Sequence, residues 1–261
     1  MLSATFDALR SKHEKALVLF VTAGDPSLDE LPEILAALTE GGADVIELGL
    51  PFSDPIADGP TIQASSQRAL DRGVTPSAVL AKLAECSVRV PIVLMGYFNP
   101  ILRKGLPEFA QAAKAAGASA TIVSDLTPEE SDDWIEVSRS NNLDTIFLAA
   151  PTSTDERLDA VCSRSSGFVY AVSRTGVTGA QSSVPEDVPA LVGRLKERTQ
   201  VPVCVGFGIS TPDHVRSVAR VADGVVVGSW LVTKLAELWD HGNGRSDLVQ
   251  QIRALKDATK P

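Results

Sequence analysis

Cysteine, histidine and basic side chains are all scarce in this sequence of 261 residues. Its three cysteines, Cys86, Cys162 and Cys204, are odd in number and lack the spacing of a metal or redox motif. A reducing compartment such as the cytoplasm is therefore the simplest interpretation. The three histidines form no cluster, which argues against a metal site. The formal net charge is -9, so we expect no non-specific binding to nucleic acid.

Long apolar runs are missing as well. The N-terminal stretch MLSATFDALRSKHEK carries charges where a signal peptide needs its apolar segment. No stretch is long and apolar enough to cross a membrane, so no membrane association is expected. None of the lysines falls inside a predicted strand, which disfavours chemistry through a Schiff base.

What the chain does contain is a regular alternation of short apolar runs and longer amphipathic ones. The apolar runs are rich in Val, Ile, Leu and Ala, as expected of parallel strands covered on both faces. They predict strands at 16–23, 44–50, 91–97, 120–125, 144–150, 167–173, 201–208 and 223–229.

Because a helical pattern follows each predicted strand, we expect an α/β fold. The pattern predicts one TIM barrel, (βα)8, over residues 1–261, with an extra N-terminal helix and extra helices in the loops. The alternative is a doubly wound sheet of similar size. That fold would want a GxGxxG turn after an early strand, and the sequence has none there.

The second predicted strand carries a carboxylate, Glu47, in an apolar run. Burying an unpaired charge is costly, so this residue needs an explanation. If Val45, Glu47 and Gly49 point into the barrel, the apolar residues between them meet the helices. Glu47 then lies near the carboxyl ends of the strands, where barrels build their sites. One interpretation is a general acid or base whose pKa is raised by desolvation. The other is a structural Glu bonded to a neighbouring strand.

The loop after this strand holds two further acids, Asp54 and Asp58, among three prolines. A proline-stiffened loop suits an acid that must be held in place. The alternative is that these residues only form a turn or cap the next helix.

Glycines follow the last two predicted strands, in Gly206-Phe207-Gly208 and in Gly228-Ser229. Both lead into helices, and this is where βα barrels bind phosphate through backbone N–H groups and helix N-termini. The alternative is that they are turn residues. Residues 173–183 form a small, polar segment hinged by glycines, which predicts either a mobile lid or an ordinary surface loop.

With Schiff-base and metal-dependent chemistry disfavoured, the reaction that the sequence still allows is carboxylate acid/base catalysis on a phosphorylated substrate. The rest of the expected pocket is apolar and includes Phe20, Leu94, Met95, Tyr97 and Phe207.

Several of these stretches resemble the α subunits of tryptophan synthase, and the match runs nearly from end to end. The most specific is ELGLPFSDPIADGPTIQ; LFVTAGDP, GYFNPI, APTSTDER, GFVYAVSRTGVTG and VCVGFGIS also stand in the family's order. One departure is Thr127, where the family more usually has a proline; it lies in a loop away from the proposed acids.

The resemblance implies a lyase that cleaves indole-3-glycerol phosphate to indole and glyceraldehyde 3-phosphate and needs no cofactor. It implies a pyridoxal-phosphate β subunit as partner, which receives indole through a tunnel in an αββα tetramer. Two alternatives stay open. The chain could act mainly as a regulatory partner of the β subunit with weak chemistry of its own, or as a free-standing indole-releasing lyase.

The resemblance also implies roles for individual residues. Glu47 matches the catalytic acid/base, which protonates indole C3 and assists deprotonation of the glycerol hydroxyl. Asp58 matches the carboxylate that accepts the indole N–H and stabilises positive charge on the ring, and Tyr170 matches the site tyrosine. The other matches are Gly179, Gly208, Gly228 and Ser229 for the phosphate, Phe20 and Met95 for the indole pocket, and Thr178 for the lid.

Overall fold

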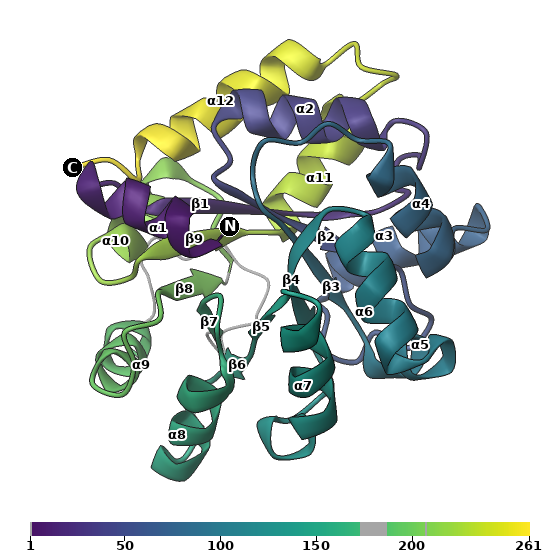
Figure 1. Cartoon of the computed structure of the whole chain (residues 1–261). Coiled ribbons are helices and arrows are strands. Elements are labelled where there is room, and N and C mark those ends of the chain that lie inside the picture. Colours follow the sequence, from purple (N-terminus) through teal and green to yellow (C-terminus); the bar gives the residue numbers. More distant parts are fainter. Residues whose placement is uncertain (1, 173–186, 207) are drawn as a thin grey trace.

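The structure, a computed structural model, describes residues 2–172, 187–206 and 208–261 (Figure 1). Its centre is a parallel sheet in the order β5-β4-β3-β2-β1-β9-β8-β7-β6. The strands are β1 (Ala16–Thr22), β2 (Val45–Gly49), β3 (Ile92–Gly96), β4 (Ala118–Val123), β5 (Asp144–Ile146), β6 (Leu148–Ala149), β7 (Val169–Val172), β8 (Val203–Gly206) and β9 (Gly224–Val227).

The sheet closes into a barrel because β5 and β6 belong to one run of chain. β5 pairs with β4, and β6 pairs with β7. Between them the carbonyl of Phe147 accepts a hydrogen bond from the backbone N–H of Tyr170 at 3.0 Å. The fifth predicted strand is thus split at Phe147, and the predicted (βα)8 barrel is confirmed. The doubly wound alternative is wrong.

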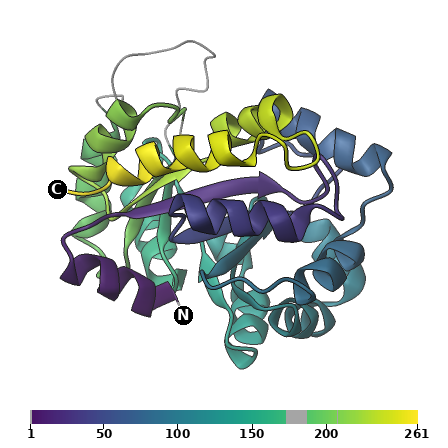
Figure 2. The same ribbon diagram turned by 90° about the horizontal axis from the view of Figure 1, so that it is seen from above.

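Helices cover the outer face of this barrel, and one helix precedes the first strand. They are α1 (Leu2–Ser11), α2 (Leu31–Gly41), α3 (Pro60–Asp71), α4 (Pro76–Ala84), α5 (Phe98–Lys104), α6 (Leu106–Ala115), α7 (Asp132–Ser140), α8 (Asp155–Arg164), α9 (Asp187–Lys196), α10 (Pro212–Ala219), α11 (Ser229–Leu238) and α12 (Arg245–Asp257), with a 3-10 turn, η1, at Pro128–Glu130. Figure 2 shows α2 and α12 side by side. None of the described helices is both long enough and apolar enough to span a membrane.

One helix, α5, was not expected from the sequence. It begins at Phe98, whose backbone N–H donates to the carboxylate of Asp125 at 2.7 Å. This capping group lies 27 residues away in the chain, so no local motif announces it. Pro100 falls in the first turn of α5, where a missing N–H costs little.

The alternation of side chains along the strands builds two separate cores. The inner one holds Val18, Val45 and Val93 inside the barrel, and its amino end is closed by Leu2 and Phe6 of α1, among others. The outer core includes Ile46, Leu48 and Leu50, packed with the apolar faces of the helices. The register predicted for β2 is therefore correct.

The same alternation corrects one expectation about the pocket. Leu94 belongs to the outer core, while its neighbour Met95 packs against the inner one. Successive residues of a strand point to opposite faces, so Leu94 points toward the helices and does not line the cavity to which Met95 contributes.

The inner core should carry a large share of the stability. Phe168 is fully buried there and contacts Phe6 at a ring-centroid distance of 6.2 Å. Phe168→Ala should lower the free energy of unfolding by about 3–5 kcal/mol, because it opens a cavity that α1 cannot fill. Urea denaturation measures this difference. The control Leu102→Ala, at a side chain 56% exposed, should change it by less than about 0.5 kcal/mol. Equal effects would contradict the assignment of this layer as core.

Candidate active site

Glu47 lies in the middle of β2, between Phe20 of β1 and Val93 of β3 in the register of the sheet. Its exposed fraction is 0%. Among the described residues, neither carboxylate oxygen has a hydrogen-bond partner. The alternative of a structural Glu bonded to a neighbouring strand therefore lacks its bond.

Burial without a partner changes the acidity of this carboxyl. Removal from water raises the pKa of Glu47 from about 4.5 to about 8. At neutral pH the protonated form predominates, yet the anion is within reach. A group with such a pKa can both donate and accept a proton during one catalytic cycle.

The loop that carries Asp58 is held from two sides. The backbone N–H of Ala57 donates to the hydroxyl of Tyr97 at 3.1 Å. The side-chain amide of Gln63, on α3, donates to the carbonyl of Asp58 at 2.8 Å. Gly59 is the N-cap of α3, and in the described structure no side chain caps this helix end. Asp58 is therefore not a helix cap, and its carboxylate is left for another task.

Asp58 is only partly buried, and its surroundings still alter its acidity. Burial raises the pKa of Asp58 to about 6, and a hydrogen bond with Tyr97 opposes the rise. Tyr97 stacks on Phe52 with ring centroids 5.0 Å apart. Sequence reasoning placed Tyr97 in the pocket wall and missed its bond to Asp58. The position of a tyrosine directly after β3, at the carboxyl end of a strand, was the only sign in the sequence that its hydroxyl reaches the site.

Asp54, in the same loop, has a simpler position. Its carboxylate accepts a hydrogen bond from the hydroxyl of its neighbour Ser53 at 2.6 Å, on the surface. Its carbonyl accepts the N–H of Ile56 at 2.9 Å. These contacts fit the turn-forming alternative.

Tyr170, on β7, brings the third predicted catalytic side chain to the same place. Burial raises the pKa of its phenol well above 10, and the charges of Glu47 and Asp58 raise it further. The three groups thus lie within electrostatic reach of one another. Gly206 of β8 makes room for the ring, because a Cβ there would lie 2.7 Å from Tyr170 Cε1.

A small cavity of about 10 Å³ adjoins Asp58. It is lined by Phe20, Gly49, Leu50, Asp58, Ile62, Ser66, Met95, Gly96, Tyr97 and Ser124. The cavity has room for about one water molecule, so a ring-sized ligand must displace lining side chains. A larger hollow of about 240 Å³ lies beside Ala118 and Asp144, where β4 and β5 begin. Barrels build their sites at the carboxyl ends of the strands, and this larger hollow lies at the amino ends. We therefore place the site at the smaller cavity.

Two of the predicted phosphate residues, Gly228 and Ser229, lie close to this cavity. Gly228 is the N-cap of α11, and Ser229 is the first residue of that helix. A Cβ at Gly228 would be 3.6 Å from Phe20 Cβ and 3.8 Å from Ile62 Cδ1, so the N-terminus of α11 adjoins the apolar wall. Gly208 has φ +55°, a left-handed conformation that favours glycine. Thr178, Gly179 and Phe207 lie outside the described residues.

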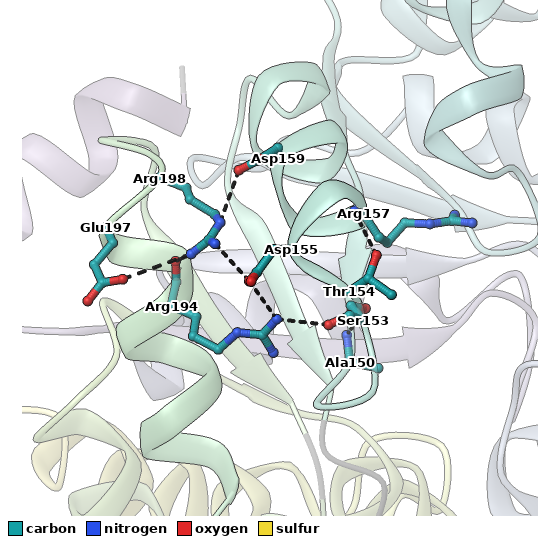
Figure 3. Close-up of polar contacts among 9 residues, drawn as sticks. All are labelled: Ala150, Ser153, Thr154, Asp155, Arg157, Asp159, Arg194, Glu197 and Arg198. Carbon is teal, nitrogen blue, oxygen red and sulfur yellow. Dashed lines mark hydrogen bonds and ion pairs between the residues drawn. The ribbon is translucent and has the colours of Figure 1, made fainter.

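The turn after β6 is also at the carboxyl end of the barrel, and α9 fixes it (Figure 3). Thr154 accepts a backbone N–H from the first turn of α8, so it is the cap of that helix. Arg194 donates to the carbonyl of Ser153 at 3.0 Å and to Asp155 at 2.9 Å. Arg198 donates to the same carboxylate at 2.7 Å. Two helices are thereby joined at the rim of the site.

Metal ligands do not gather in the part of the chain that the structure describes: it contains no group of three His, Cys, Asp or Glu side chains able to hold an ion. The chemistry available at the site is that of two carboxyls and a phenol around an apolar pocket.

Comparison with known proteins identifies the family. The family model of the tryptophan synthase alpha chain matches residues 6–260. The chain belongs to this family. The alpha chain of Citrifermentans bemidjiense is 52% identical, over 99% of this chain and 96% of the relative. That of Desulfatibacillum aliphaticivorans is 47% identical, over 98% and 97%.

Solved structures agree in fold. Tryptophan synthase of Mycobacterium tuberculosis superposes with a TM-score of 0.92 at 40% identity, covering 100% of this chain and 98% of the other. The alpha subunit of Legionella pneumophila gives 0.90 at 34% identity, covering 99% and 97%. The described part of the chain therefore has the tryptophan synthase alpha fold, including the strand that bears Glu47.

The acidity of Glu47 should appear in the pH dependence of stability. The folded chain keeps the proton up to a pH of about 8, whereas an ordinary Glu loses it near 4.5. Between these values the unfolded state binds fewer protons, so the free energy of unfolding falls as pH rises, by up to about 1.4 kcal/mol per pH unit. Glu47→Gln removes this contribution and should gain stability over the wild type across that range.

Urea unfolding at several pH values measures the difference between the two proteins. The matched control is the same substitution at Glu136, which is exposed on α7. A difference between Glu47→Gln and wild type that does not vary with pH would contradict the raised pKa.

Proposed function

We propose that this chain is the alpha subunit of a tryptophan synthase and cleaves indole-3-glycerol phosphate to indole and glyceraldehyde 3-phosphate. The observation that carries the proposal is Glu47, which is buried without a hydrogen-bond partner among the described residues and lies near Tyr170 and Asp58 in a barrel of the tryptophan synthase alpha chain family. This is a lyase reaction in tryptophan biosynthesis, and its retro-aldol step requires a proton donor and a proton acceptor.

Asp58 and Glu47 have different roles in this reaction. Asp58, ionised near neutral pH, accepts a hydrogen bond from the indole N–H and stabilises the positive charge on the ring. Glu47, protonated, donates its proton to indole C3 and then accepts the proton of the glycerol hydroxyl beside the breaking bond. The electrons of the C–C bond return to the ring, which leaves indole and the aldehyde. The net transfer is one proton from the hydroxyl to C3. Tyr170 borders both acids and helps to orient the substrate.

The other predicted residues bind the rest of the substrate. Phe20 and Met95 line the cavity beside Asp58, and their apolar side chains would contact the indole ring once the cavity widens to admit it. Gly208, Gly228 and Ser229 hold the phosphate, because α11 directs its free backbone N–H groups to that place. The resemblance to the family assigns Gly179 to the phosphate and Thr178 to the lid, and both lie outside the described residues.

We also propose a β subunit as partner, in an αββα tetramer that receives the indole, and a cytoplasmic location. We propose further that the whole chain, residues 1–261, forms one domain, and the single sheet shared by the described strands supports this. The two alternative functions differ from this proposal in how they depend on the β subunit. A purely regulatory alpha subunit would alter β activity without releasing indole, and a free-standing lyase would be fully active alone. Indole release, measured with and without added β subunit, separates the three.

Removing the acid/base should abolish most of the activity. Glu47→Gln keeps the shape of the side chain and cannot exchange the proton, so indole release should fall by about a hundredfold or more. The control, Glu136→Gln, changes an exposed carboxyl on α7 and should retain wild-type turnover. Near wild-type turnover in Glu47→Gln would exclude Glu47 as the acid/base.

The pH profile should report both acids. The reaction begins with Asp58 ionised and Glu47 protonated, so kcat/KM should fall below a pH of about 6 and above about 8. Asp58→Asn should lose the acid limb while keeping the alkaline one. A flat profile, or an acid limb that survives Asp58→Asn, would contradict these assignments.

A further inference from the structure

Besides Asp58, the aspartate Asp25 also lies in a loop at the carboxyl end of a strand, β1, and it is only 8% exposed. The residue before it, Gly24, has φ +89°, and a Cβ there would be 2.6 Å from Val74 Cγ2. Only glycine allows the chain to pass so close to the segment that follows α3. The loop therefore presses Asp25 against α3.

Both oxygens of the Asp25 carboxylate accept hydrogen bonds from side chains of α3. It accepts hydrogen bonds from the hydroxyl of Ser65 at 2.7 Å and from Arg68 Nε and Nη2 at 3.0 and 2.6 Å. Arg72 Nη1 lies 3.6 Å away. Ser65 is fully buried. Two oxygens bound by a guanidinium fork and a hydroxyl fix both the distance and the direction between β1 and α3.

The position of α3 in turn decides the position of Asp58. The helix begins at Pro60, two residues after Asp58, and its Gln63 donates to the carbonyl of Asp58 at 2.8 Å. Ile62 and Ser66, on the same helix, line the cavity together with Asp58. A shift of α3 along its axis would therefore move the carboxylate and one wall of the pocket together.

We propose that Asp25 is a positioning residue for the indole half of the substrate: through Ser65 and Arg68 it places α3, and through α3 it places Asp58. It does not touch the substrate. The inference rests on the proposed function, because it assigns Asp58 to the indole N–H. It predicts that loss of Asp25 harms recognition of indole and spares recognition of the phosphate-bearing fragment, which binds near α11.

The chain offers a matched control in Asp44. This aspartate accepts the backbone N–H of Leu17 at 2.7 Å and Lys256 Nζ at 2.9 Å. It stands just before β2, at the opposite, amino end of the barrel. Asp44→Asn thus breaks a similar polar anchor without touching α3. Both substitutions should lower the thermal midpoint, and only Asp25→Asn should affect indole.

The reverse reaction separates the two halves of the substrate. With purified full-length chain, indole and glyceraldehyde 3-phosphate are condensed and KM is measured for each. Asp25→Asn should raise the KM for indole by about tenfold or more, the cost of misplacing a charged hydrogen-bond acceptor. The KM for glyceraldehyde 3-phosphate should stay within about twofold, as should both values in Asp44→Asn.

A double mutant tests whether Asp25 acts through Asp58. The probe is indole-3-propanol phosphate, an uncleavable analogue, bound to wild type, Asp25→Asn, Asp58→Asn and the double variant in a calorimeter. Asp25→Asn should weaken binding by about tenfold in the wild-type background and by less than about twofold in the Asp58→Asn background. Equal losses in both backgrounds would overturn the proposal.

A milder variant keeps the test open if Asp25→Asn does not fold. Ser65→Ala removes one donor and leaves the bonds of Arg68 to Asp25, so it should shift the KM for indole in the same direction by a smaller factor. Equal changes in both KM values would reduce Asp25 to a structural anchor. If wild-type chain itself neither releases indole nor condenses it, the proposed function fails instead.

Discussion

The site depends on one constraint: Glu47 is fully buried in the barrel, and the described residues offer its carboxyl no hydrogen bond. Its raised pKa follows from that desolvation alone. Desolvation requires that the barrel be closed, that Phe20 and Val93 flank the strand, and that the layer below be packed. Any change that let water reach Glu47 would return it to an ordinary carboxyl, which is too acidic to keep a proton at neutral pH.

Asp58 complements Glu47 because its surroundings differ. It lies on a loop, partly exposed and bonded to Tyr97, so its pKa rises only to about 6. Two carboxyls near Tyr170 thus hold different protonation states at the same pH, which is how paired acids acquire distinct roles. In the proposed mechanism the strand fixes the group that moves a proton, while the loop, tied to α3 by Gln63, holds the group that meets the indole ring.

The barrel and the inward face of β2 were predictable from the periodicity of the sequence, and the acidic loop from its position after a strand end. Tyr170 could be predicted only from the resemblance to the tryptophan synthase alpha chains. What could not be predicted depends on contacts distant in the chain. Phe98 is capped by Asp125, and Asp25 is bonded by Ser65 and Arg68, 40 and 43 residues away. The bond between Tyr97 and Asp58 is of the same kind: both residues were visible, and only the fold brings them together.

The two ends of the barrel bury different kinds of groups. At the amino end, Leu2 and Phe6 close an apolar layer, and Asp44 is held by Lys256 and the N–H of Leu17. Toward the carboxyl end lie groups whose burial opposes folding: Glu47 with its raised pKa, and Thr22, whose hydroxyl has no hydrogen-bond partner among the described residues. Such groups lower the free energy of unfolding, so the apolar packing of the inner and outer cores must offset them. A barrel allows this difference because all its strands run in the same direction. Their carboxyl ends meet at one end of the barrel, where polar groups can gather, while the amino ends can stay apolar.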